Sequence, residues 1–167
     1  DIDVTDYKSV LKGQVLIKSF IDTWVQPGWL VSIEFDFITG TNSYQHTIVR
    51  NLWNYDRLVY GDPSIPIDIS TINEYLPLDT EEAYIRITTT GHGQGNTENA
   101  AEFSNKEHAI LINGQISHTH SFWRADCELN QCSPQNGTWQ YDRAVFCPGD
   151  KVAAQNLSVL NYATPGE

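Results

Sequence analysis

Four groups of side chains in this sequence of 167 residues have the types and the spacing that binding or catalysis uses. The first is Glu102, which follows the glycine-rich segment Gly91-His-Gly-Gln-Gly95. Alternating glycines allow positive φ angles and a close approach of the backbone to a ligand. The spacing is not that of a dinucleotide fingerprint, and no strand-to-helix unit surrounds it. The segment is therefore either a surface loop with a solvated glutamate or an active-site loop that presents a carboxylate to a polar ligand.

The second group is His118-Thr-His120. On a β-strand, residues i and i+2 point to the same face, so both imidazoles could chelate one metal ion. The alternative is a pair of hydrogen-bonding histidines at a strand edge. A copper site would need a third ligand, and a thioether is excluded because the sequence contains no methionine. The pattern favours the hydrogen-bonding interpretation.

The third and fourth groups pair a carboxylate with arginine or with an indole. Arg143 follows Asp142 in an aromatic-rich stretch. Its planar fork of donors suits carbonyl and carboxylate oxygens, although a local ion pair in a loop would look the same. Asp22 and Trp24 follow an expected strand. A carboxylate beside an indole is suited to a sugar, and it is equally typical of a polar loop with one anchored aromatic residue.

The three cysteines, Cys127, Cys132 and Cys147, set limits on redox and metal chemistry. None belongs to a CxxC pair, which argues against a zinc knuckle. An odd number leaves at most one disulfide and one free thiol. Cys132 is a weak candidate nucleophile because nothing near it in sequence marks a partner base. The sequence also lacks a Gly-x-Ser-x-Gly elbow and a metalloprotease helix.

The charge balance excludes several classes of partner. The chain carries 10 basic and 21 acidic residues, for a net charge of −11. The charge balance argues against nucleic acid as a partner, because neutralising phosphates requires lysine and arginine, and an anionic membrane surface is disfavoured for the same reason. No apolar run approaches the roughly 20 residues of a membrane span, so no membrane insertion is expected. No signal peptide opens the chain, so export would require a signal that was removed or lies outside this sequence.

The elements that must position these groups are strands. Apolar and polar residues alternate over residues 30–37, and similar patterns at 15–20, 83–90, 108–113 and 115–120 also predict strands. Asn113-Gly114 predicts a hairpin turn between the last two. One short helical turn is expected at 7–11 after the capping-type Thr5. The pattern predicts an all-β chain, organised as a sandwich, with a boundary near residues 40–45.

The segment Trp139-Gln-Tyr-Asp-Arg-Ala-Val-Phe-Cys-Pro-Gly149, together with two shorter motifs, resembles the peptide:N-glycosidase F family. The family's corresponding segment is Trp-x-x-Asp-Arg-Ala-Gly-Trp-Cys-Pro-Gly. Ala100-Ala-Glu-Phe103 is similar to Cys-Ala-Glu-Trp, and Asp22-Thr-Trp24 to Glu-Thr-Trp. The likeness is collinear over nearly the whole chain. The first motif is the most specific, because no simple physical pattern would generate it.

The resemblance implies an all-β fold of two side-by-side jelly-roll sandwiches, an architecture shared with peptidylglycine monooxygenases. Residues 1–41 would be the last strands of a first, truncated jelly-roll domain. Residues 42–167 would form a second jelly-roll domain that lacks its final strands. The implied reaction is hydrolysis of the amide between asparagine and the first N-acetylglucosamine of an N-linked glycoprotein or glycopeptide, with no metal or organic cofactor.

The resemblance also implies roles for single residues. Glu102 matches a glutamate important for activity, which would bind the core sugar or the catalytic water. The implied substrate-binding residues are Asp22, Trp24, His92 and Arg143. A catalytic aspartate is expected upstream of residue 1, so these 167 residues alone are expected to be inactive. The same interpretation expects Glu102→Ala to abolish the activity of a longer protein while leaving its melting temperature nearly unchanged.

The implied disulfide joins Cys127 to Cys147, which leaves Cys132 unpaired. The chain departs from the family at several cleft positions. A small disulfide around the glutamate is absent, and three tryptophans of the family's cleft appear here as His92, Phe103 and Phe146. Glycan specificity could therefore differ from that of the family.

Two other functions remain open. The chain could be a non-catalytic glycan-binding or scaffold component that binds a partner chain in a bacterial surface complex. The less favoured alternative is a relative of the copper- and ascorbate-dependent monooxygenases, for which His118 and His120 would supply two ligands. A secreted, periplasmic or bacterial cell-surface location is expected for the family.

Overall fold

The computed structural model describes residues 2–21, 30–41, 44–53, 58–59, 62, 64–65, 67, 69–93 and 102–166. Contacts divide the chain into two units, Asp1–Asn54 and Tyr55–Glu167. The described residues contain antiparallel strands and short 3-10 helices but no α-helix. The β class predicted from the sequence is therefore confirmed. The predicted domains, 1–41 and 42–167, stay a prediction.

The first unit contains the 3-10 helix η1 (Thr5–Tyr7), near the helical turn expected at 7–11. The strands predicted at 15–20 and 30–37 are wrong, because neither range forms a hydrogen-bonded ladder with another described residue. Every residue in both ranges is exposed, including Phe20 and Phe37 at 88% and 81%. Alternation supplies a face that could be buried, but a strand also needs a neighbouring strand to satisfy its backbone groups.

The second unit contains a hairpin of β2 (Glu107–Ile112) and β3 (Gln115–Ser121), as the sequence predicts. Asn113 and Gly114 turn the chain with φ angles of 51° and 76°. Positive φ at both central residues matches the right-handed twist of the strands, which explains the Asn-Gly pair. The register shifts between Ile110 and Leu111.

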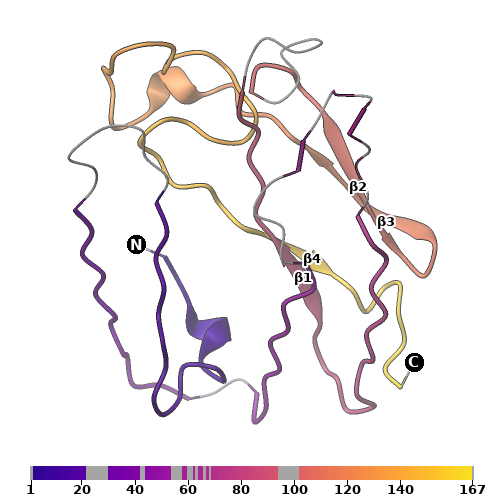
Figure 1. Cartoon of the computed structure of the whole chain (residues 1–167). Coiled ribbons are helices and arrows are strands. Elements are labelled where there is room, and N and C mark those ends of the chain that lie inside the picture. The colour runs from indigo at the N-terminus through magenta and orange to yellow at the C-terminus, as the bar shows by residue number, and fades with distance from the viewer. Residues whose placement is uncertain are drawn as a thin grey trace. The chain divides into compact units, whose positions relative to one another are not determined.

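Another antiparallel pair joins β1 (Tyr84–Ile87) to β4 (Gln155–Ser158) (Figure 1). β1 lies within the strand predicted at 83–90. The sequence pattern does not predict β4, because its residues Gln-Asn-Leu-Ser are mostly polar. β4 forms because β1 supplies its hydrogen-bonding partner. A side-chain hydrogen bond adds to this pairing, since Arg86 on β1 donates from Nε to Asn156 Oδ1 at 2.9 Å.

Side chains of the hairpin connect it to β4 and to the segment that follows. His118 Nε2 lies 2.9 Å from Ser158 O, and His120 Nδ1 lies 3.0 Å from Gln155 Nε2. Asn113 Nδ2 donates to the backbone oxygen of Tyr162 at 3.2 Å. Polar contacts therefore hold the two pairs of strands together within this unit.

The most buried side chains of the described residues do not belong to the strands. They gather in the segment that follows β3 and include Phe122, Cys127, Ala144 and Cys147. That segment contains the 3-10 helix η3 (Cys127–Leu129). The core thus lies at the segment that carries Arg143, which is itself only 2% exposed. No helix in the described part of the chain is long and apolar enough to cross a membrane.

Candidate active site

The backbone of Arg143 and Ala144 brings together three segments that are distant in the sequence. Arg143 forms an antiparallel bridge with Arg124, with N–H to carbonyl distances of 3.0 and 2.8 Å. The Ala144 N–H donates to the Glu102 carbonyl at 2.9 Å, and the Ala144 carbonyl accepts from Gly91 N–H at 3.2 Å. This one short segment thereby places Arg143 beside Glu102 and the start of the glycine-rich loop.

The side chains of Glu102 and Arg143 form an ion pair. Arg143 Nη1 donates to Glu102 Oε1 at 2.8 Å, and the two side chains are 3% and 14% exposed. The backbone N–H of Gly93 lies 3.4 Å from the other carboxylate oxygen, Oε2. Burying a charge is costly unless it is paired and hydrogen-bonded. The arrangement therefore holds the Glu102 carboxylate in one place, with a small part of it open to solvent.

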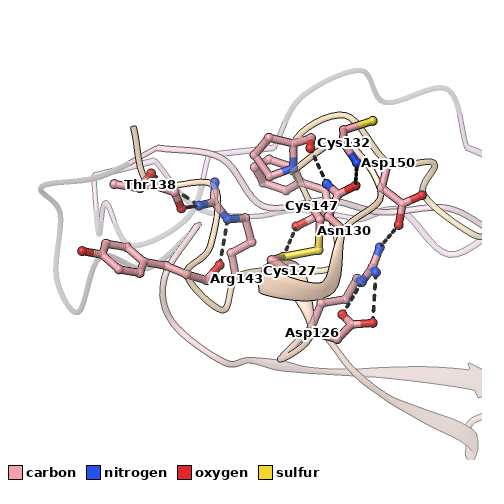
Figure 2. The surroundings of a disulfide bond; sticks show 12 residues. Asp126, Cys127, Asn130, Cys132, Thr138, Arg143, Cys147 and Asp150 are labelled. Atoms are coloured by element: carbon pink, nitrogen blue, oxygen red, sulfur yellow. Dashed lines mark hydrogen bonds and ion pairs between the residues drawn. A yellow bond between two sulfur atoms is a disulfide. The ribbon is translucent and has the colours of Figure 1, made fainter. Parts of the chain in front are cut away.

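Arg143 is held on its other sides as well. Its Nε donates to Tyr141 O at 3.1 Å, and its Nη2 donates to Thr138 O (Figure 2). The guanidinium carbon lies 5.0 Å and 5.3 Å from the ring centroids of Phe103 and Phe146, within the range of a cation–π interaction. Each guanidinium nitrogen thus has a partner, which suits Arg143 to orienting Glu102.

His92 adjoins this pair through Phe146. The imidazole and the phenyl ring lie 4.4 Å apart, centroid to centroid, and His92 Nε2 lies 2.9 Å from Thr90 Oγ1. The His92 side chain is exposed, whereas the neighbouring Gly91 is buried. The glycine-rich loop therefore presents an imidazole at the solvent side of the aromatic ring that covers Arg143.

A disulfide closes the loop that carries Arg143 (Figure 2). Cys127 and Cys147 are bonded, are 20 residues apart, and are buried to 0% and 1% exposure. The predicted pairing is confirmed, and Cys132 is an exposed free cysteine. Gly149 has a φ of +84°, and a Cβ at this position would lie 2.8 Å from the Cys132 Cβ. This glycine is therefore required by both conformation and space.

Arg124 and its two carboxylate partners near this loop have shifted pKa values. A hydrogen bond with Asp126 is the main cause that raises the pKa of Arg124. Hydrogen bonds from Arg124 are in turn the main cause that lowers the pKa values of Asp126 and Asp150. All three side chains are partly exposed, so solvent screens the energetic effect of these shifts.

The two histidines of the His-x-His pattern lie on β3 and take part in the contacts with β4. Both engage ring nitrogens in hydrogen bonds, with Ser158 and Gln155. Among the described residues, no group of three or more histidine, cysteine, aspartate or glutamate side chains could hold a metal ion. The geometry favours the interpretation that these histidines serve as hydrogen-bonding groups.

The structure brings together Glu102, Arg143 and His92 of the predicted site residues. Asp22 and Trp24 lie outside the described residues. Sequence reasoning missed the N–H of Gly93 and the backbone carbonyl oxygens that accept from Arg143, because backbone groups leave no signature in the residue types. It also missed Arg124, although the segment from Arg124 to Asp126 already shows a basic residue close to an acidic one.

Comparisons with known proteins define the class. The family model described as "Peptide-N-glycosidase F, C terminal" matches residues 65–165, so the chain belongs to the peptide-N-glycosidase F family. The chain is similar to peptide-N(4)-(N-acetyl-beta-D-glucosaminyl)asparagine amidase F of Elizabethkingia miricola, with 33% identity over 177 aligned residues. That alignment covers 99% of this chain and 49% of the relative, so the chain spans about half the relative's length. No solved structure matches the chain significantly.

Proposed function

We propose that this chain forms one wall of the active site of an amidase that hydrolyses the bond between asparagine and N-acetylglucosamine in N-linked glycoproteins. The observation that carries the proposal is the Glu102 carboxylate, held by the buried Arg143 and by the N–H of Gly93. The name of the Elizabethkingia relative, an asparagine amidase, supports the same reaction.

In the proposed reaction, water adds to the carbonyl carbon of the asparagine side chain. The carbon–nitrogen bond then breaks, its electron pair leaves with the glycosylamine nitrogen, and that nitrogen takes up a proton. Asparagine becomes aspartate, and the glycosylamine hydrolyses further. Glu102 accepts a hydrogen bond from the water or from the core sugar. A carboxylate whose position is already set needs no reorganisation during the reaction, which lowers the barrier.

The other predicted residues have supporting roles in this proposal. Arg143 holds Glu102 in place, and its aromatic neighbours form a surface against which a sugar face can stack. His92 contacts the substrate from the exposed side of Phe146, where its imidazole can donate or accept a hydrogen bond. Asp22 and Trp24 are proposed as further substrate-binding residues. The reaction uses no metal and no organic cofactor.

A specific β architecture and a cellular location are also proposed. Two jelly-roll sandwiches are proposed for the complete protein, supported by the antiparallel strands and by membership of the family. The disulfide supports a secreted, periplasmic or cell-surface protein, because disulfides persist in oxidising compartments. An N-linked glycoprotein or glycopeptide would be the partner there.

A non-catalytic glycan-binding or scaffold function is the second candidate. The observation that favours it is the presence of Phe103 and Phe146 where the family has tryptophans. The rings of both residues lie against the Arg143 guanidinium. Rings that pack on an arginine offer less surface to a sugar than free indoles would. Such a site could bind a glycan, or a partner chain of a surface complex, without cleaving the amide.

The proposal can be tested by a deglycosylation assay, in which a denatured N-glycoprotein is incubated with the full-length protein that contains this chain. We expect a mobility shift on a gel and conversion of the glycosylated asparagine to aspartate, detected by mass spectrometry. Glu102→Gln should abolish both, while Glu107→Gln, a change at an exposed glutamate of β2, should abolish neither. Binding of a glycopeptide without cleavage by the wild-type protein would support the non-catalytic candidate.

A further inference from the structure

The side chain of Arg124 joins both ends of the loop that the disulfide closes. Its Nε and Nη2 atoms donate to the two carboxylate oxygens of Asp126, at 2.9 and 3.1 Å. Its Nη1 atom donates to Asp150 Oδ2 at 2.9 Å. Asp126 directly precedes Cys127, and Asp150 follows Cys147 by three residues. An ionic connection thus lies beside the covalent one.

The backbone of Arg124 reaches the candidate active site directly. Its N–H and carbonyl form the two-way bridge with Arg143, at 2.8 and 3.0 Å. The same residue therefore holds the base of the loop with its side chain and the backbone of Arg143 with its own backbone. Because the Arg143 guanidinium donates to Glu102, the position of Arg124 sets the direction from which that donor arrives.

We propose that Arg124 is a positioning residue for the Glu102–Arg143 pair. The inference rests on the proposed function, since it concerns the carboxylate assigned to the reaction. An isolated surface ion pair contributes little. Arg124 differs because it forms a bidentate fork with one carboxylate and donates a third hydrogen bond to another. This geometry needs the planar guanidinium, and a lysine ammonium cannot reproduce it.

The disulfide and the Arg124 connection act in parallel. Each keeps the start of the loop, at Asp126 and Cys127, close to its end, at Cys147 and Asp150. With the disulfide intact, loss of the Arg124 fork loosens the bridge to Arg143 without opening the loop. With the disulfide reduced, the fork still connects these two ends, together with the hydrogen bond from Asn130 Nδ2 to the Pro148 carbonyl. The Glu102–Arg143 pair should therefore depend more strongly on Arg124 after reduction.

The experiment compares Arg124→Lys with the wild-type full-length protein by hydrogen exchange measured with NMR. The matched control is Arg86→Lys, because Arg86 also donates to a side chain distant in the sequence, that of Asn156, but lies on β1. In Arg124→Lys, the Arg143 Nε–H and the backbone N–H groups of Arg143 and Ala144 should exchange about tenfold faster, as expected for the loss of one charge-assisted hydrogen bond. Dithiothreitol should enlarge this difference.

The backbone N–H groups of β2 and β3 serve as an internal reference. If Arg143 and Ala144 exchange at the wild-type rate in Arg124→Lys, the positioning role is wrong. If the N–H groups of the hairpin accelerate by the same factor, Arg124 is a general stabiliser and the proposal is also wrong. Because exchange needs no turnover, it tests Arg124 even if the deglycosylation assay rejects the amidase function. If the amidase is active, Arg124→Lys should lower kcat more than it changes KM.

Discussion

At the scale of single residues, Arg143 has a different environment from the one that its sequence suggests. The sequence allows a loop ion pair or an exposed donor fork for a substrate. In the structure Arg143 is 2% exposed, and its guanidinium donates to Glu102 and to two backbone carbonyl oxygens. A side chain with these partners orients a carboxylate. Its removal should therefore affect both stability and the candidate active site.

The first prediction concerns this buried pair. Arg143→Met should lower the free energy of unfolding by about 3 kcal/mol, because it leaves the Glu102 carboxylate without its buried counter-charge. Urea denaturation of the protein measures the change. The double variant Glu102→Gln/Arg143→Met should lose less, because no unpaired charge remains. A single variant as stable as the wild type would mean that the pair is not buried in solution.

The burial of this pair also changes the expected effect of Glu102→Ala on stability. The family resemblance predicts that Glu102→Ala leaves the melting temperature nearly unchanged. The pair with Arg143 is buried, so Glu102→Ala leaves a guanidinium without its counter-charge and should lower the melting temperature. For that reason Glu102→Gln, which keeps a hydrogen-bond acceptor, is the better variant for testing catalysis.

A second prediction at this scale concerns pH. Burial, and to a lesser degree the charge of His120 opposite it on β3, lowers the pKa of His108. The folded protein thus binds fewer protons here than the unfolded chain, whose histidines titrate near pH ~6.5. The contribution of His108 to stability is complete above that pH and is lost as the pH falls through the lowered pKa.

The measurement is urea denaturation from about pH 8 to about pH 5, the range in which histidines change charge. The loss of stability towards acid should be smaller in His108→Gln than in the wild type. His46→Gln serves as the control, because His46 is an exposed histidine of the first unit. A wild-type and a His108→Gln protein with parallel pH profiles would contradict the prediction.

At the scale of elements, local sequence patterns succeeded where the partner of a strand is its neighbour in sequence. The hairpin of β2 and β3 forms as predicted, because Asn113 and Gly114 form the turn that connects the two strands directly. The ranges 15–20 and 30–37 have equally clear patterns but form no described ladder. β4 has no pattern and forms because β1 supplies its hydrogen-bonding partner.

The prediction at this scale concerns the loop between Cys127 and Cys147. Replacing both cysteines by serine should lower the free energy of unfolding by about 3 kcal/mol, as expected for releasing a loop of this length in the unfolded chain. Urea denaturation checks the value. Cys132→Ser is the matched control and should change stability little, because Cys132 is exposed and unpaired. Equal stability of the three proteins would show that other contacts already close the loop.

At the scale of the whole molecule, the two units differ in how deeply their described residues are buried. The buried side chains named above all belong to Tyr55–Glu167, and no described residue of the first unit is buried. Exposed apolar side chains instead follow one another along residues 15–21 and 30–38. Without burial, the hydrophobic effect contributes little to ordering these segments.

This difference predicts the pattern of amide exchange in the 167-residue chain. Amides of residues 15–21 and 30–41 should open with free energies near zero, while those of β2 and β3 approach the stability of their whole unit. Hydrogen exchange followed by mass spectrometry resolves the two groups. Protection of residues 30–41 equal to that of the hairpin would show that they pair with another segment in solution.

The sequence by itself determined the β class and the hairpin, and its motifs identified the family, whose resemblance implies the pairing of Cys127 with Cys147. These properties follow from local patterns, or from motifs whose residues are specific enough to identify relatives. The proximity of Glu102 and Arg143 could be inferred only through the family resemblance. The residue types alone left both in loops, where a solvated glutamate and a local ion pair were equally good interpretations.

Only the tertiary structure decided what these residues contact. Arg143 meets Glu102 across 41 positions of the chain, and Arg124 meets Asp150 across 26. Contacts at such separations leave no periodicity in the sequence. They also depend on backbone groups, such as the bridge between Arg124 and Arg143, which every residue type can provide. The burial that makes the ion pair important arises from the packing of distant segments.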